Sequence, residues 1–289
     1  MTMADNLLKN LLYLKRKYNI VFKKKLSQHF LIDYKVLEKI IDFANLNKDD
    51  IILEIGPGLG FLTRLIIPKV KKVIAVEIDK VFSEILKCEV NTKKLEVIEA
   101  NILEINYFSV NKIISNVPYS ISSKLFLKLL SFDFDYAILM FQKDFVDKIF
   151  ANPGNKNYGK ISALSQLFYN ISLLEIVPPD AFYPKPKVYS AIIKLCKKKE
   201  RLYLTPYIIS FWNFLSIFFS RPHRINRATF KGWVKQKYVS QKQYSYLKEK
   251  FPEVFQKRAI NTTPEEILRI YNLLFPVLSY EEKYNQEGN

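Results

Sequence analysis

The chain has 289 residues, 49% of them hydrophobic and 15% aromatic, which is enough for one large domain with a buried core and a smaller appended domain. Its 45 Lys and Arg residues against 28 acidic residues give a formal net charge of +17, which favours a polyanionic partner such as nucleic acid, although AT-rich coding would produce a similar excess of lysine. No apolar run is long enough to predict a membrane span, and Cys88 and Cys196 lack metal-ligand spacing, so neither a metal site nor a disulfide framework is predicted.

The first residues are predicted to form an N-terminal extension, residues 1–22. Leucines spaced among lysines predict an amphipathic helix over Asn6–Tyr18. Polar and charged residues interrupt any apolar core of a secretory signal, so we expect a cytoplasmic location.

From Asp49 onward, short β-rich runs alternate with helical stretches, which predicts a parallel, doubly wound α/β sheet. The five runs are Ile51–Ile55, Val73–Glu77, Leu95–Ile98, Lys112–Ser115 and Tyr136–Met140. Two later runs, Ile171–Val177 and Val188–Leu195, are expected to close the sheet with an antiparallel edge. After Glu200 the strands stop and aromatic-rich helical patterns follow, so we place the boundary between a domain over residues 23–200 and a helical domain over residues 201–289.

A glycine-rich turn follows the first strand. Gly56, Gly58 and Gly60 let the backbone turn sharply and approach a ligand closely. Pro57 removes a backbone N–H, which does not suit a loop that holds a pyrophosphate. Glu77 ends the next strand, where its carboxylate can accept hydrogen bonds from ribose hydroxyls, unless it merely faces water there. A nucleoside without phosphates, S-adenosylmethionine, fits these features better than NAD.

The tetrapeptide Asn116–Tyr119 ends the fourth strand, at the edge where doubly wound sheets bind ligands. Pro118 forces the preceding residue toward an extended backbone, which would aim the Asn116 amide oxygen and the Pro118 carbonyl into the site. Two such acceptors can hold the two hydrogens of an adenine amino group while the Tyr119 ring stacks on the base. A strand-terminating turn is the alternative interpretation of this tetrapeptide.

Six segments in chain order resemble the rRNA adenine dimethyltransferase family, in its archaeal and eukaryotic branch. They are Lys25–Asp33, Glu54–Gly60, Val76–Asp79, Asn116–Ser123, Asn157–Ser162 and Pro178–Val188. The resemblance covers about residues 23–200. It implies a class I, Rossmann-like methyltransferase domain with a seven-stranded sheet, a small C-terminal α-helical RNA-binding domain, and S-adenosylmethionine as cofactor.

By the same resemblance, His29 and Leu31 would lie over the methionine end of the cofactor, with Gly56 and Gly58 in the turn beneath it. Asn101 stands where the family usually has an aspartate on the adenine amino group. An asparagine still accepts one hydrogen bond but carries no charge, so weaker cofactor binding without loss of activity is expected.

The target base would be held from two sides in the family. Asn116 would serve both the cofactor and the target, and Phe182 would stack on the adenine from the face opposite Tyr119. Without the resemblance, Phe182 would be taken as a core aromatic beside a proline turn. Ser27 replaces the usual glycine of the first motif, which affects the local turn.

Five cations near the C-terminus are spaced three or four residues apart, which predicts a cationic stripe on one helix. They are Arg221, Arg224, Arg227, Lys231 and Lys235. A solvated helix face is the alternative, but like charges without an intervening acid favour contact with RNA. Pro222 and His223 interrupt the spacing. The lysine runs 23–25 and 197–199 would extend this surface.

These observations predict a monomeric methyltransferase that dimethylates adenosines in small-subunit rRNA or in the pre-ribosomal small subunit. Two alternatives share the scaffold: a large-subunit rRNA methyltransferase of the antibiotic-resistance type, and a ribosome-assembly or transcription factor with weak or no activity. A nucleotide-dependent dehydrogenase is disfavoured by Pro57 and by the position of Gly60.

Overall fold

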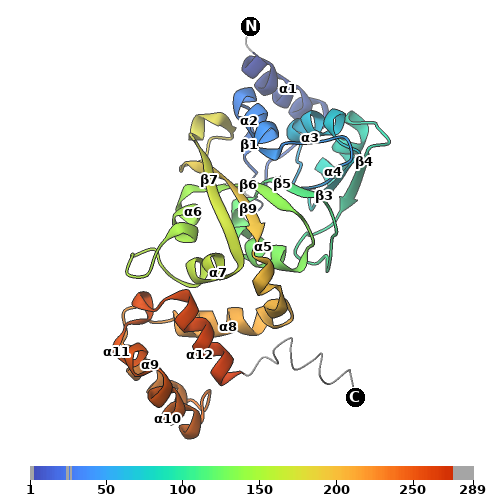
Figure 1. The fold of residues 1–289 in the computed structure, drawn as a ribbon. Helices are drawn as coiled ribbons and strands as arrows, with labels where there is room; N and C mark the ends of the chain where they lie inside the picture. The colour runs from blue at the N-terminus through green and yellow to red at the C-terminus, as the bar shows by residue number, and fades with distance from the viewer. Residues whose placement is uncertain (1–2, 24–25, 27, 276–289) are drawn as a thin grey trace, which may run out of the picture. The chain divides into compact units, whose positions relative to one another are not determined.

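A computed structural model describes residues 3–23, 26 and 28–275 (Figure 1). It divides into two compact units, one formed by Met1–Val146 with Ile171–Lys197, the other by Asp147–Asn170 with Lys198–Asn289. Ser27, with the turn expected there, and two of the lysines in the run 23–25 lie outside the described residues.

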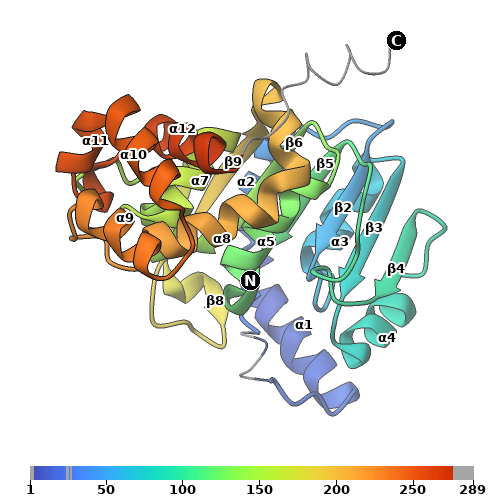
Figure 2. The ribbon, with the colours of Figure 1, turned by 90° about the horizontal axis from the view of Figure 1, so that it is seen from below.

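The first unit contains a seven-stranded sheet with the order β4-β3-β2-β5-β6-β9-β7, which confirms the predicted α/β architecture. Figure 2 shows β4, β3, β2, β5 and β6 side by side. These five strands are parallel, and β9 pairs antiparallel with β6. The strands are β2 (Ile51–Ile55), β3 (Lys72–Glu77), β4 (Leu95–Glu99), β5 (Lys112–Asn116), β6 (Tyr136–Gln142), β7 (Tyr169–Val177) and β9 (Ser190–Lys197).

The central strands are continuous apolar runs because helices cover both faces of a parallel sheet. Ile52, Leu53, Ile113 and Ile114 are fully buried. The helices of this unit are α2 (Tyr34–Ala44), α3 (Phe61–Ile66), α4 (Lys80–Glu89), α5 (Ser122–Lys128) and the start of α6 (Lys143–Phe150). A separate two-stranded ribbon pairs β1 (Phe30–Leu31) with β8 (Phe182–Tyr183).

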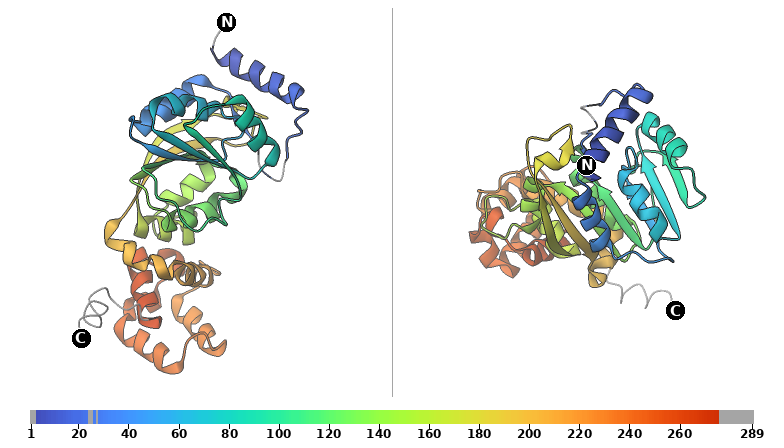
Figure 3. Two further views of the ribbon diagram at one scale, coloured as in Figure 1. Left: turned by 90° about the vertical axis from the view of Figure 1, so that its right-hand side faces the viewer. Right: turned by 90° about the horizontal axis from the view of Figure 1, so that it is seen from above.

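The N-terminal helix was predicted at Asn6–Tyr18 and spans Met3–Lys17 as α1 (Figure 3). Leu11 and Leu14 are buried in the core of the first unit. The end of the helix is tied to α4, because the Lys17 Nζ and Tyr18 hydroxyl lie 2.8 and 2.6 Å from the same Glu89 oxygen. This helix is therefore an integral part of the first unit.

The second unit is helical, as predicted for the C-terminal part of the chain. Its helices are α7 (Lys160–Phe168), α8 (Ile208–Phe218), α9 (Asn226–Lys235), α10 (Gln241–Lys250), α11 (Pro252–Gln256) and α12 (Pro264–Leu274), with the 3-10 stretch Lys199–Tyr207 directly before α8. The apolar stretch from Tyr207 forms helix α8. Among the described residues, no helix is long and apolar enough to cross a membrane.

A single boundary near Glu200 does not describe these units, because residues 147–170 pack with the C-terminal helices. The Tyr158 hydroxyl, ahead of α7, donates a 2.8 Å hydrogen bond to the backbone oxygen of Thr262, ahead of α12. Sequence pattern alone does not reveal such long-range packing.

The sheet brings several predicted site residues to one edge. β2 pairs with β3 on one side and with β5 on the other. The chain therefore adds β3 and β4 on one side of β2, and then crosses to the other side to add β5 and β6. The carboxyl ends of these strands carry Gly56, Glu77 and Asn116. Doubly wound sheets bind ligands in the crevice that forms at such a switch point.

Candidate active site

The glycine turn and Glu77 form the floor of a pocket at this edge. Gly56, Gly58 and Gly60 have φ values of 66°, 55° and 77°, in the left-handed region that favours glycine. A Cβ on Gly60 would also clash with the Leu86 side chain. The turn is fixed to the next strand, because the Gly58 N–H donates to Glu77 Oε2 over 3.0 Å.

The Glu77 carboxylate is buried and already accepts two backbone hydrogen bonds. The second comes from the Asp79 N–H, 2.9 Å from Oε1. Burial raises the pKa of Glu77, while the backbone donors of Asp79 and Gly58 lower it. Each carboxylate oxygen keeps a free lone pair, so the group can still accept hydrogen bonds from a ligand's hydroxyls.

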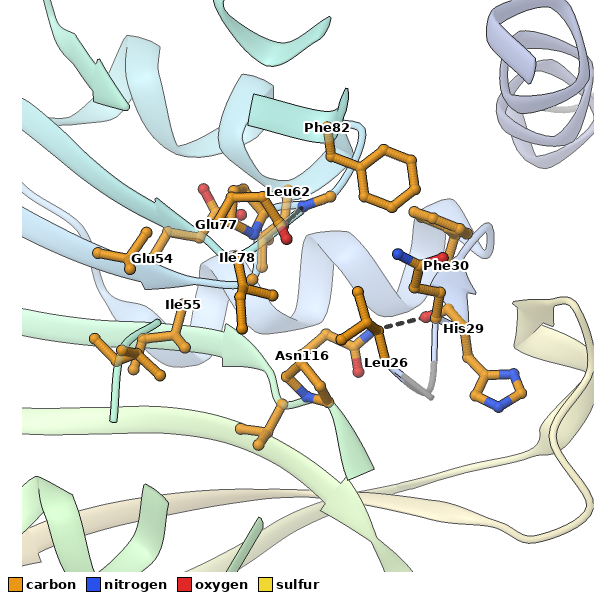
Figure 4. Close-up of a pocket in the computed structure, with 18 of the residues that line it drawn as sticks. Leu26, His29, Phe30, Glu54, Ile55, Leu62, Glu77, Ile78, Phe82 and Asn116 are labelled. Atoms are coloured by element: carbon orange, nitrogen blue, oxygen red, sulfur yellow. Dashed lines mark hydrogen bonds between the residues drawn. The ribbon is translucent and has the colours of Figure 1, made fainter. Parts of the chain in front are cut away.

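The pocket gathers nine of the ten residues predicted for the cofactor and the acceptor base (Figure 4). They are His29, Leu31, Gly56, Gly58, Glu77, Asn101, Asn116, Pro118 and Tyr119. Among the described residues, the lining includes no lysine or arginine, and its charged groups are Glu54 and Glu77. A ligand rich in donors and free of phosphates therefore suits this pocket better than a dinucleotide does.

Glu54 is a pocket residue that sequence reasoning did not single out. Its side chain is 2% exposed, and Oε2 has no hydrogen-bond partner among the described residues. Burial raises the pKa of Glu54 to about 8, and the neighbouring Glu77 carboxylate acts in the same direction. A buried acceptor without a partner points to a donor on the ligand. The sequence feature that could have identified Glu54 is a carboxylate within an otherwise apolar strand.

Asn116 is oriented by a contact across the pocket. Its Nδ2 donates to the backbone oxygen of His29 over 3.1 Å, which Figure 4 marks with a dashed line. None of the described residues donates a hydrogen bond to its Oδ1. The amide oxygen is therefore available to accept a hydrogen bond from a ligand.

The rest of the tetrapeptide is equally fixed. The Pro118 carbonyl accepts the Ile121 N–H over 3.1 Å and retains a second lone pair. The Tyr119 hydroxyl lies 2.8 Å from the Ser190 Oγ at the start of β9. Burial raises the pKa of Tyr119, although the contact with Ser190 lowers it.

His29 lines the pocket, whereas Phe182 does not. The His29 ring is directed away from Glu77 (Figure 4) and stacks on Tyr119, with ring centroids 5.4 Å apart. Phe182 is 2% exposed in the core and does not line the pocket, because β8 pairs with β1 and turns the ring inward. The stacking role of Phe182 stays a prediction that requires this ring to become accessible.

Asn101 lies two residues beyond β4 and uses both ends of its amide locally. Oδ1 accepts the Leu103 N–H over 3.1 Å, and Nδ2 donates to Glu104 Oε1 over 2.8 Å. The first bond fixes which end is the oxygen, since a backbone N–H cannot bond to an NH₂ group. Glu104 thus places a carboxylate beside the uncharged residue.

A model of the family described as ribosomal RNA adenine dimethylase matches residues 19–274. The chain belongs to this family. Its relatives include the probable ribosomal RNA small subunit methyltransferase A of Pyrococcus abyssi, 34% identical over 266 residues that cover 91% of this chain and 96% of that protein. The protein of the same name from Methanopyrus kandleri is 42% identical over 192 residues, 66% of this chain and 69% of that protein.

Solved structures agree with this assignment to the adenine dimethylase family. A dimethyladenosine transferase from Plasmodium falciparum has a TM-score of 0.70 at 31% identity, with 89% of this chain and 97% of that chain covered. The 23S rRNA methyltransferase ErmE has a TM-score of 0.59 at 23% identity, with 85% and 99% covered, and shares the fold. The resemblance inferred from the six sequence segments is thereby confirmed.

Apolar residues of the pocket were also missed by the sequence analysis. Ile78 follows Glu77 directly and is 52% exposed, whereas Ile102, which follows Asn101, is only 4% exposed. Phe82 closes one side and contacts the Phe30 ring edge-on at 5.4 Å. For Ile78, the available signal was an apolar residue immediately after the polar end of a strand, since an exposed apolar side chain there gains burial when a ligand covers it.

The predicted cationic stripe on one helix is wrong in part. Arg227, Lys231 and Lys235 lie on α9, whereas Arg221 and Arg224 precede it in the loop after α8. The reason is Pro222, which lacks the N–H that a continuous helix needs. All five side chains are exposed, and within the described part of the chain none of them forms an ion pair.

Proposed function

We propose that this member of the adenine dimethylase family uses S-adenosylmethionine to dimethylate the exocyclic amino group of adenosines in small-subunit ribosomal RNA. The orientation of Asn116 carries the proposal: Nδ2 is held by the His29 backbone, and Oδ1 remains as an acceptor at the rim of a pocket without lysine or arginine among its described residues. The relatives named above supply the substrate class, since their names specify small-subunit RNA.

The pocket residues fit this cofactor. Glu77 would accept hydrogen bonds from the ribose hydroxyls, and Asn101 with Ile102 would border the adenine. The unpartnered Glu54 Oε2 would take a hydrogen bond from a donor of the ligand. When bound, the cofactor supplies an activated methyl group.

The chain's own contribution is to hold the target nitrogen. The lone pair of an adenine amino group is delocalised into the ring, so the nitrogen is a poor nucleophile. Asn116 Oδ1 and the Pro118 carbonyl would each accept one amino hydrogen, which favours a pyramidal nitrogen with an exposed lone pair. The Tyr119 ring would stack on the base and fix its plane. The proton leaves after transfer, so no general base is required.

The exposed cations of the second unit would bind the phosphates around the target. Arg221 and Arg224 in the loop and Arg227, Lys231 and Lys235 on α9 are free of ion pairs with described residues, so their charges remain available. This contact is independent of sequence and would position the RNA, while Asn116 selects the base. The pocket is lined by residues of one chain. In this proposal the protein acts as a cytoplasmic monomer during ribosome biogenesis.

The deciding experiment supplies methyl-labelled cofactor, in separate reactions, to purified small and large ribosomal subunits that lack adenosine dimethylation, followed by mapping of the labelled nucleotides. We expect dimethyladenosine in small-subunit RNA only. Label in large-subunit RNA would instead support the resistance-type alternative. RNA binding without any label would support an assembly factor that uses the same scaffold.

A further inference from the structure

The ring of His29 makes two contacts on the acceptor side of the pocket. It stacks on Tyr119 with an interplanar angle of 27°, and its Nδ1 lies 2.6 Å from the backbone oxygen of Pro184. A carbonyl oxygen only accepts hydrogen bonds, so Nδ1 carries the proton in this contact. Neither contact is made toward Glu54 or Glu77, where the cofactor is placed above.

The orientation of the Tyr119 ring is fixed by contacts at both ends of the side chain. Its hydroxyl is held by Ser190 Oγ at 2.8 Å, and the tetrapeptide that carries it continues directly from β5. The face covered by His29 is therefore fixed in place. An imidazole is also the five-membered half of a purine, so the His29 ring occupies this face much as an adenine would.

The backbone of His29 is held independently of its ring. Its carbonyl accepts the Asn116 amide, and the next residue begins β1, which pairs with β8. Rotation of the side chain can thus free the Tyr119 face without disturbing the Asn116 contact. The cost is one ring stack and one hydrogen bond.

We infer that His29 is a gate for the target base: its imidazole covers the stacking face of Tyr119 in the absence of RNA and must swing out when an adenine enters. The inference rests on the proposed function, because it takes Tyr119 as the stacking surface. His29 is then a specificity-determining residue, because displacing its ring costs free energy. Only a base whose RNA is itself well bound offsets that cost.

The test measures binding of adenosine, or of the fluorescent 2-aminopurine riboside, to protein saturated with S-adenosylhomocysteine so that the cofactor pocket is filled. His29→Ala should bind the nucleoside about tenfold more tightly than the unmodified chain, as expected for removing one stack and one hydrogen bond. Every variant is kept saturated with S-adenosylhomocysteine, so a change in cofactor affinity does not affect the comparison of nucleoside binding. His29→Phe, which keeps a ring for Tyr119 and loses only the hydrogen bond to Pro184, is the matched control and should gain less affinity than His29→Ala.

Unchanged or weaker nucleoside binding by cofactor-saturated His29→Ala would overturn the gate. If that variant unfolds, nitrogen NMR of the unmodified chain answers the same question: nucleoside should abolish the hydrogen-bonded Nδ1 signal, and a signal that persists in the complex refutes the proposal. The two failures can be distinguished. Failure of the gate would appear in nucleoside binding, whereas failure of the proposed function would appear as absent methyl transfer to ribosomal RNA.

Discussion

The Asn116 side chain donates its amide hydrogen to the backbone oxygen of His29 across 3.1 Å, linking the end of β5 to the segment that enters β1. This bond decides which end of the amide faces outward. Asn116→Ala removes the acceptor and should lower kcat at least about a hundredfold while leaving RNA affinity unchanged. Single-turnover transfer and RNA binding measured on the same preparations check this. Asn116→Asp is the control: it keeps an acceptor but loses the donor to His29, so it should also be impaired.

Two substitutions of Tyr119 distinguish the contribution of its ring to kcat/KM from that of its hydroxyl. Tyr119→Phe retains the stacking surface and loses only the contact with Ser190, so kcat/KM for RNA should fall by a few-fold. Tyr119→Ala removes the surface and should reduce kcat/KM by about tenfold to a hundredfold. Equal losses in both variants would mean that the hydroxyl, not the ring, is what the target base needs.

Asn101 is paired with Glu104, so restoring the family's aspartate should not help by itself. In Asn101→Asp the amide nitrogen, 2.8 Å from Glu104 Oε1, becomes a second carboxylate oxygen. Like charges at that distance repel, so cofactor affinity should stay the same or fall. The double variant Asn101→Asp with Glu104→Gln removes the repulsion and should bind cofactor more tightly than either single variant. Calorimetric titration of all four proteins tests this, and strictly additive effects would count against the pairing.

The exposed cations should control the salt dependence of RNA binding. Replacing Arg227 and Lys231 on α9 by alanine should lower the slope of log K against log salt by roughly one for each phosphate that the variant no longer neutralises. The loop pair, Arg221 and Arg224, tests whether the loop contributes equally. The control replaces two exposed lysines of α4, Lys80 and Lys87, and should leave the slope unchanged. A slope unaffected by the first two pairs would remove these cations from the interface.

Glu54 should make the ligand-free protein less stable as pH rises. Burial raises its pKa from 4.5 to about 8, so between these values the folded state keeps a proton that the unfolded chain releases. Stability from this group is complete below about pH 4.5 and is lost as pH approaches 8, by at most ~1.4 kcal/mol per pH unit. Glu54→Gln should lose less stability over that range. Urea unfolding at pH 5, 6.5 and 8 compares the two proteins, and parallel curves would contradict the assignment.

The strands and the cofactor half of the pocket were predictable from local pattern. β2 was predicted at its observed bounds because a run that is apolar except for Glu54 ends at a glycine turn, and both signals act within a few residues. Glu77 and Asn116 were placed correctly for a general reason: parallel strands bring their carboxyl ends to one edge. The prediction of one cationic helix was wrong at Pro222, because the regular spacing of basic residues in the sequence continues through the loop between α8 and α9.

The sequence alone thus determined the sheet, the glycine turn, the acidic residue that follows it, and the Asn-Val-Pro-Tyr motif at the rim. Tertiary structure decided where side chains point. The direction of the His29 ring depends on Pro184, 155 positions away, and the burial of Phe182 depends on pairing between β1 and β8. Local periodicity carries no information on such distant contacts, because they form only when the whole chain has packed.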